Sequence, residues 1–251
     1  MVRPIRSILL EGVSHGFLTR EGGVSTGVVA GLNVGRGSGD DERAVAENRR
    51  RAAEAVLPGA HLVSVYQVHS SDCVIVAEPW DENDRPQADA LVTDRPGLLL
   101  GIVTADCAPV LLADRERGIV GAAHAGWKGA RRGVIDSTVA AMERLGASRS
   151  AIVAAIGPCI AQASYEVGDD FKTNFADEDS PFFAPGREGH WHFALEACVA
   201  SRLERAGVTR IDPLGLDTYS DQEHFFSYRR ATHRGEANYG RQFSLIGIAA
   251  S

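Results

Sequence analysis

Cysteine is scarce in this 251-residue chain, and its placement argues against a disulfide framework. The four cysteines, Cys73, Cys107, Cys159 and Cys198, lie far apart, and no two of them form a Cys-x-x-Cys pair. Small secreted domains that depend on disulfides are much richer in cysteine. The thiols are therefore expected to stay reduced, in the cytoplasm, where a free thiol can bind a metal or react.

Long hydrophobic runs are also missing. The most apolar stretch, residues 98–113, is interrupted by Asp106 and is shorter than the ~20 apolar residues that a membrane helix needs. The run at residues 8–10 is too short for the apolar core of a secretory signal. The sequence thus predicts neither a membrane span nor an export signal.

Clusters of lysine and arginine are absent, and the formal net charge is −7. Nucleic acids and anionic membranes are usually bound by surfaces with excess positive charge. We therefore expect small-molecule partners rather than nucleic acid or membrane, and a monomer or a weak homodimer.

Apolar runs rich in valine, isoleucine and leucine recur through the first half of the chain. Glycine, proline and aspartate flank these runs, as they commonly flank strands. Most connections between the runs are too short for helical crossovers. A mixed or largely antiparallel sheet is therefore predicted. The predicted strands are 62–68, 73–77, 90–93, 98–103, 110–113 and 119–123, followed later by 151–156 and 243–249.

Helices and long loops complete the predicted elements. Three segments have the apolar spacing of amphipathic helices: 41–56, 130–145 and 195–206. Gly146 and Gly207 follow the last two as C-caps. Residues 174–189 and 229–241 are expected to be long loops, which are often functional in compact domains.

Three side chains that bind zinc well lie near the ends of predicted strands. They are His69, Cys107 and His124, and the chain between the last two runs out and back like a hairpin. A catalytic zinc takes three protein ligands of this kind and keeps its fourth position open. These residues are therefore candidate zinc ligands.

Two other interpretations of the three residues stay open. Their spacings of 38 and 17 residues match no short zinc motif, and spacing alone favours a core histidine and a buried thiol. Cys107 can also be a nucleophile with His124 as its base. Asp106 is not expected to orient that base, because adjacent strand residues point to opposite faces.

Candidate anion contacts follow His124. In Gly126-Trp127-Lys128-Gly129, free N–H groups at the start of a helix lie beside a lysine, which suits a phosphate. The simpler alternative is a turn with a solvated lysine. Arg229 and Arg230 offer further anion contacts.

A series of short motifs runs almost end to end along the chain. It includes His15-Gly16-Phe17, Asn33-Val34-Gly35, Glu47-Asn48-Arg49, Gln67-Val68-His69, Ala88-Asp89-Ala90, Thr104-Ala105-Asp106-Cys107, His124-Ala125-Gly126-Trp127, Gly157-Pro158-Cys159 and Phe226-Ser227-Tyr228-Arg229-Arg230. In these motifs and their order, the sequence resembles the laccase-domain (YfiH-type) family of purine nucleoside phosphorylases.

The resemblance implies a fold and an activity. The fold is α+β, one domain over residues 1–251 with mixed β-sheets flanked by helices in a layered α/β/β/α sandwich. The activity is zinc-dependent phosphorolysis of adenosine, inosine and methylthioadenosine, with adenosine deamination also reported in the family. Zinc would be held by His69, Cys107 and His124, with Cys107 and His124 catalytic.

Four residues are expected to bind the nucleoside or inorganic phosphate: Asn33, Gln67, Lys128 and Arg229. Tyr239 departs from the family, whose members commonly have threonine before Gly240-Arg241. If its loop borders the pocket, this departure affects substrate preference more than chemistry.

The same residues also offer alternatives to this function. A cysteine hydrolase or a peptidoglycan-precursor editing factor would use Cys107 and His124 without a metal. A copper-dependent phenol oxidase is disfavoured, because His190-Trp191-His192 is the only His-x-His motif. A non-enzymatic binding module is the last alternative.

Overall fold

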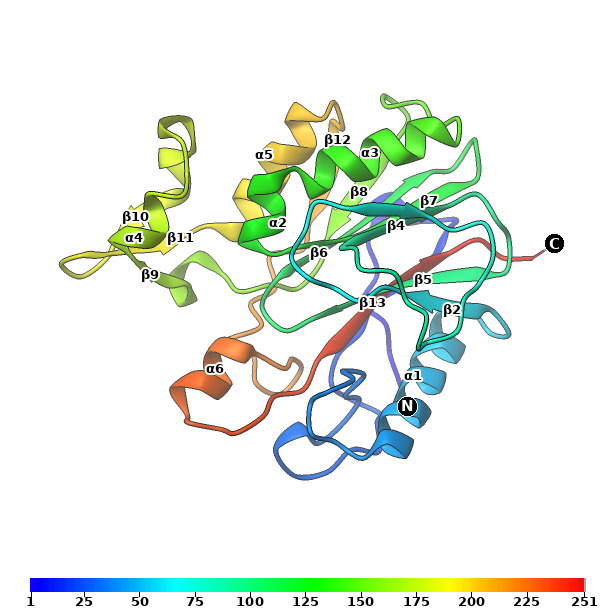
Figure 1. The fold of residues 1–251 in the computed structure, drawn as a ribbon, viewed down its shortest axis with the longest axis horizontal. Coiled ribbons are helices and arrows are strands. Elements are labelled where there is room, and N and C mark those ends of the chain that lie inside the picture. Colours follow the sequence, from blue (N-terminus) through cyan, green and yellow to red (C-terminus); the bar gives the residue numbers. More distant parts are fainter. Residues whose placement is uncertain (251) are drawn as a thin grey trace.

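Two β-sheets stacked face to face form the centre of the molecule (Figure 1). The computed structural model describes residues 1–250. The four-stranded sheet has the order β1-β13-β5-β2, and the six-stranded sheet has the order β12-β8-β6-β7-β4-β3. Their strands are β1 (Ser14–Phe17), β2 (His61–Ser64), β3 (Cys73–Ile75), β4 (Ala90–Thr93), β5 (Leu98–Thr104), β6 (Ala108–Asp114), β7 (Ile119–Ala125), β8 (Val153–Ile156), β12 (Arg210–Pro213) and β13 (Gln242–Gly247).

Both sheets are mixed, as predicted. In the six-stranded sheet β6 pairs antiparallel with β7 and β8, whereas β3 pairs parallel with β4 and β12 with β8. In the four-stranded sheet β13 pairs antiparallel with β1 and β5, and β2 pairs parallel with β5. Every residue of β6 and β7 is buried, because both faces of these strands are covered.

Helices cover the two outer faces, which confirms the α/β/β/α arrangement. The helices are α1 (Glu42–Val56), α2 (Trp127–Arg132), α3 (Val134–Arg144), α4 (Asp169–Lys172), α5 (Leu195–Arg205) and α6 (Tyr228–His233), with 3-10 turns η1 (Ile8–Leu10), η2 (Gly27–Val29), η3 (Gln162–Ser164) and η4 (Asp177–Phe182). The helix α1 packs on the four-stranded sheet, and α3 and α5 pack on the six-stranded sheet. Asp41 caps α1 by accepting hydrogen bonds from the Arg43 and Ala44 amides.

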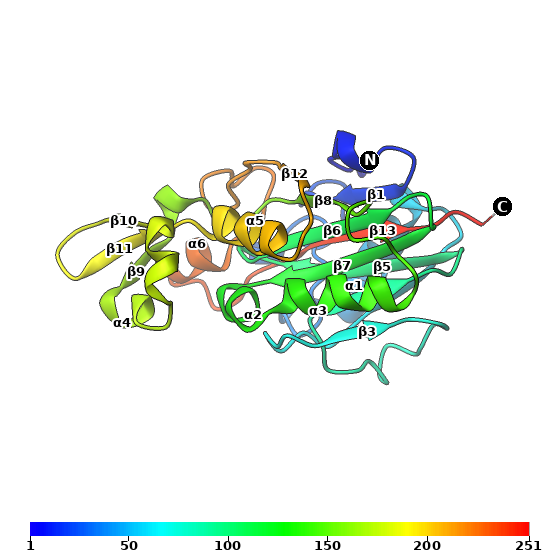
Figure 2. The same ribbon diagram turned by 90° about the horizontal axis from the view of Figure 1, so that it is seen from above.

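A small third sheet lies at one end of the molecule, on the left in Figures 1 and 2. Its order is β10-β11-β9, with β9 (Glu166–Gly168), β10 (Phe183–Pro185) and β11 (His190–Phe193). Within residues 1–250 no helix combines the length and the apolar character that crossing a membrane requires.

Several predicted boundaries were wrong. The predicted helix 130–145 is two helices, α2 and α3, because Gly133 between them has a left-handed φ of 94°. The predicted strand 62–68 ends at Ser64. The predicted loops 174–189 and 229–241 contain η4, β10 and most of α6. These elements are too short to produce a recognisable periodicity in the sequence.

Candidate metal centre

His69, Cys107 and His124 converge as predicted. Their ligand atoms all lie within 4.8 Å of one another, and Cys107 Sγ is 3.9 Å from His69 Nε2. Cys107 ends the link from β5 to β6, and His124 lies on β7, which pairs with β6. His69 does not end a strand as expected but lies in the loop after β2, with a left-handed φ of 59°.

Asp89 holds two of these residues in place, a role that the sequence analysis did not assign. Its buried carboxylate accepts a hydrogen bond from His124 Nδ1 at 2.8 Å. It also accepts bonds from the backbone amides of Val68, His69 and Ser70, at 3.1, 3.0 and 2.6 Å. The bond to Nδ1 leaves Nε2 of His124 free as a ligand atom, the arrangement typical of metal-binding histidines.

Gly126 provides the space that the cluster occupies. A β-carbon at this position would lie 2.9 Å from Cys107 Sγ and 3.0 Å from His69 Cδ2. Both distances are shorter than ordinary van der Waals contact. A side chain here would therefore displace two of the three candidate ligands.

The cluster favours a thiolate at Cys107. Burial opposes ionisation of this thiol, but the charge of His124 and hydrogen bonds with His124 and His69 outweigh burial and lower the pKa of Cys107 to about 6. Burial would likewise lower the pKa of His124, but the Cys107 charge and the Asp89 hydrogen bond raise it to about 9. A thiolate beside two imidazoles is a good donor set for a soft or borderline metal ion.

As the sequence predicts, Asp106 does not orient His124. The backbone conformation at Asp106, however, is not the strand that was predicted. Asp106 lies in a bend with a φ of 87°. Its buried carboxylate accepts hydrogen bonds from Thr218 Oγ1 at 2.7 Å and from the Arg229 amide at 2.6 Å. Asp106 therefore ties the segment that carries Arg229 to the loop beside Cys107.

The cluster opens onto a cavity of about 690 Å³. Tyr66 and Tyr228, which are 55% and 53% exposed, line it together with Tyr239. The loop that carries Tyr239 therefore borders the pocket. A smaller cavity of about 180 Å³, lined in part by Trp127, Tyr165 and Arg229, adjoins His69 and Cys107.

Two of the predicted substrate-binding residues have structural tasks in this structure. Gln67 lines the larger cavity, but its amide group donates to the Val103 carbonyl at 2.8 Å and accepts from the Val103 amide at 2.9 Å. Asn33 is fully buried and does not line the cavity. Its Oδ1 accepts hydrogen bonds from the amides of Gly35 and Arg241 and so positions these two residues. Its contact with substrate stays a prediction.

The other two predicted residues differ in position. Lys128 is exposed and lines neither cavity beside the cluster; its Nζ lies 5.5 Å from the centre of the Trp127 ring. The phosphate contact of Lys128 therefore stays a prediction, without support from either cavity. Arg229 lines the smaller cavity and donates from Nη1 to the Glu166 carbonyl at 2.7 Å. Arg230 is buried and donates to three backbone carbonyls, so it does not supply the expected anion contact.

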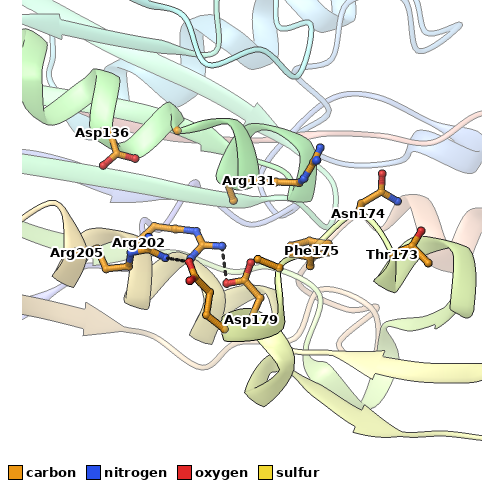
Figure 3. Close-up of a pocket in the computed structure, with 12 residues that line it drawn as sticks. Arg131, Asp136, Thr173, Asn174, Phe175, Asp179, Arg202 and Arg205 are labelled. Atoms are coloured by element: carbon orange, nitrogen blue, oxygen red, sulfur yellow. Dashed lines mark hydrogen bonds and ion pairs between the residues drawn. The ribbon is translucent and has the colours of Figure 1, made fainter.

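A separate cavity of about 430 Å³ lies between α2, η4 and α5 (Figure 3). Arg202 on its wall pairs with Asp179 at 2.7 Å. None of the three candidate metal ligands lines it.

His190 and His192 lie on β11, where His192 Nδ1 contacts the Gln162 carbonyl, and they do not join a metal cluster in the described part of the chain.

A family model described as multi-copper polyphenol oxidoreductase laccase matches residues 14–249. The chain belongs to this family. The purine nucleoside phosphorylase of Deinococcus radiodurans is 42% identical over 239 residues, which cover 94% of this chain and 89% of the relative. A purine nucleoside phosphorylase of Streptomyces coelicolor is 39% identical, over 88% of this chain and 91% of the relative.

Solved structures agree with this laccase-domain assignment. A Neisseria meningitidis protein of family DUF152 has a TM-score of 0.88 and 34% identity, and the match covers 99% of each chain. YlmD from Geobacillus stearothermophilus has a TM-score of 0.88 and 32% identity, covering 97% of this chain and 94% of its own. The family and the fold are therefore those that the motifs indicated.

Proposed function

We propose that this protein is a zinc-dependent purine nucleoside phosphorylase that acts on adenosine, inosine and methylthioadenosine. The observation that carries the proposal is the position of the His69, Cys107 and His124 cluster in the wall of a cavity of about 690 Å³. The names of the relatives support the reaction class.

Zinc suits the donor set. Two imidazoles and a thiolate are typical zinc ligands, and three ligands leave a position open, as in catalytic sites. The three donor atoms lie within 4.8 Å of one another, and Cys107 Sγ and His69 Nε2 are 3.9 Å apart, so the three residues would hold one metal ion. The glycine at position 126 leaves the required room. Bound there, zinc would supply Lewis acidity next to the substrate.

The reaction breaks the bond between C1′ of the ribose and N9 of the purine and forms a bond between C1′ and a phosphate oxygen. The purine leaves with the electron pair of the broken bond and takes up the proton that the attacking hydrogen phosphate gives up. The products are the free base and the sugar 1-phosphate, which is ribose 1-phosphate from adenosine or inosine and 5-methylthioribose 1-phosphate from methylthioadenosine. The protein must therefore hold the nucleoside and phosphate together in one cavity, away from water that would compete.

The aromatic residues of the cavity support a purine substrate. Tyr66 and Tyr228 present exposed rings, and the rings of Tyr228 and Tyr239 are 5.0 Å apart. Exposed aromatic faces of this kind stack well on a flat heterocycle. Tyr239 replaces the threonine common in the family, so we expect it to affect the choice among nucleosides.

A cysteine hydrolase is the second candidate, favoured by the lowered pKa of Cys107 beside His124. Such a dyad does not require His69, yet His69 Nε2 also faces the sulfur. The third donor favours a metal site over a dyad. Deamination of adenosine is not named for the relatives, and the test below measures it separately.

The test is the release of free purine from adenosine, inosine and methylthioadenosine, with and without inorganic phosphate. We expect free base and the corresponding sugar 1-phosphate in equal amounts, with product formation dependent on phosphate and abolished by a chelator. A rate of purine release that does not depend on phosphate, or that is unchanged after complete removal of metal, would reject the proposal. Inosine formed from adenosine without phosphate would instead indicate deamination.

A further inference from the structure

The cavity beside the metal cluster is strongly cationic, although the chain as a whole is acidic, with a net charge of −7. Four arginines line it: Arg36, Arg49, Arg85 and Arg241. Aspartate and glutamate are absent from its lining. A concave surface of one charge concentrates ligands of the opposite charge.

One nearby carboxylate neutralises only part of this charge. Glu82 pairs with Arg49, with Arg36 at 3.1 Å and with Arg85 at 3.4 Å. Arg49 is buried and is also satisfied by Ser64 and by the Val34 carbonyl. A single carboxylate therefore faces three guanidinium groups, which leaves the arginine-lined wall positive.

Arg241 has no carboxylate partner among the described residues. Its Nη2 donates to the Tyr239 hydroxyl at 2.9 Å, and its Nη1 is buried without a hydrogen-bond partner in residues 1–250. Burying such a donor unpaired is costly, so its usual partner is a ligand or an ordered water. Arg241 thus lines the cavity and has one guanidinium nitrogen without a partner in the described residues.

Thr104 supplies a second free group. It is 2% exposed and lines the cavity, and its Oγ1 has no hydrogen-bond partner in the described residues. It pairs with Gln242 in the β5–β13 ladder, so it lies next to the residue that follows Arg241. Two residues that line this cavity therefore each have a polar atom without a hydrogen-bond partner in the described residues.

The backbone around Arg241 is built to hold its side chain. A β-carbon on Gly35 would lie 2.9 Å from Arg241 Nη1, so only glycine leaves room for the guanidinium there. Asn33 Oδ1 accepts hydrogen bonds from the amides of both residues, at 3.1 and 2.9 Å. The sequence motif Asn33-Val34-Gly35 thereby positions Arg241 and places Arg36 on the same cavity.

We propose that Arg241, Thr104 and Arg36 bind a phosphate group in the cavity that adjoins the metal cluster. Arginine donors and a hydroxyl are the groups that recognise phosphate oxygens. The inference rests on the proposed function in taking this group to be the inorganic phosphate of phosphorolysis; the phosphate of a nucleotide has the same chemistry. This site is separate from Lys128, the residue for which the sequence predicts a phosphate contact and which lies on the surface.

Calorimetric titration of the metal-loaded full chain tests the site. Inorganic phosphate, AMP and adenosine are titrated separately at one ionic strength. We expect inorganic phosphate to bind, and Arg241→Gln and Arg36→Gln each to weaken its binding about 10- to 100-fold, as for the loss of a charged hydrogen bond. Arg95→Gln, which removes an exposed arginine paired with Asp94, is the matched control and should leave binding unchanged.

The source of the phosphate is read from the same titrations. If AMP binds more tightly than adenosine, if Arg241→Gln removes that difference, and if inorganic phosphate does not bind, the site takes a nucleotide phosphate. Phosphate binding that depends on Arg241 in a protein without phosphorolysis would uphold the site and reject the proposed function. Absence of binding by both phosphate and AMP, or wild-type binding by Arg241→Gln, would overturn the inference.

One further variant keeps the test decisive. Arg241→Lys retains the charge and guards against loss of folding, and Arg36 is 43% exposed, so Arg36→Gln should fold. In steady-state assays the Arg36 and Arg241 variants should raise the KM for phosphate while the KM for the nucleoside stays close to the wild-type value. An equal rise in both values would contradict a dedicated phosphate contact.

Discussion

At the scale of single residues, Asp89 shows how one buried carboxylate can organise a metal site. It binds His124 and the three consecutive backbone amides that place His69. Burial would raise its pKa, but the hydrogen bond and charge of His124, with the backbone amides, lower it to about 2. Asp89 is thus a charged acceptor for both ligand-bearing segments.

Asp89→Asn keeps the shape of this side chain but removes its charge. We expect zinc affinity to fall about 10- to 100-fold, as for other partners of metal-bound histidines, and the free energy of unfolding to fall by about 3 kcal/mol. A competitive chelator titration and urea unfolding measure the two effects. Asp94→Asn, at a partly exposed aspartate, is the control, and equal zinc affinity in both variants would contradict the assigned role.

Gly126 makes a second prediction at this scale. In Gly126→Ala the new methyl group would lie 2.9 Å from Cys107 Sγ, so the cluster must open and zinc affinity should drop at least about tenfold. Gly168→Ala is the matched control, because its nearest neighbour lies 4.0 Å away. Zinc content after dialysis against a weak chelator compares the variants, and unchanged retention by Gly126→Ala would count against the ligand geometry.

The ligands themselves could be predicted from sequence because histidine and cysteine carry distinctive chemistry at the ends of apolar runs. The role of Asp89 could not be predicted from the sequence, although the motif Ala88-Asp89-Ala90 was recognised. An aspartate before a strand is usually a turn residue, and only the tertiary fold shows that it is buried against His124.

At the scale of elements, the β6–β7 hairpin and the short helix α2 deliver the site. The register of the hairpin pairs Pro109 with His124. The helix α2 begins at Trp127, directly after Gly126. The hairpin was predicted from its apolar runs, whereas the break between α2 and α3 was not. The apolar spacing continues across Gly133 in the sequence. Only the left-handed φ of 94° at Gly133, seen in the structure, shows that the helix axis changes direction there.

Gly133→Ala tests whether this break matters to the fold. A residue with a β-carbon is strained at this φ, so we expect the free energy of unfolding to fall by about 1–2 kcal/mol. Arg131→Ala, two residues earlier on α2, is the control and should change stability little. Urea unfolding of both variants supplies the measurement, and a Gly133→Ala protein as stable as wild type would show that the turn is relaxed.

At the scale of the whole molecule, the two stacked sheets bring distant segments to one cavity. Arg36, Arg49, Arg85 and Arg241 come from loops and a helix spread over the chain. The sequence shows no basic cluster, so the cationic cavity could not be predicted from it. The overall sandwich could, because several ordered motifs identified the family, and the family fixes the fold.

We propose that His69, Cys107 and His124 hold a zinc on which phosphorolysis depends. Cys107→Ser tests it most directly, because a serine hydroxyl stays protonated at neutral pH and binds zinc poorly. Bound zinc and phosphorolysis of adenosine are measured in wild type, Cys107→Ser and His69→Ala, with far-UV circular dichroism as the folding control. We predict about one zinc per wild-type chain and a joint loss of zinc and turnover in both variants. Full zinc and full activity in Cys107→Ser would show that Cys107 is not a zinc ligand.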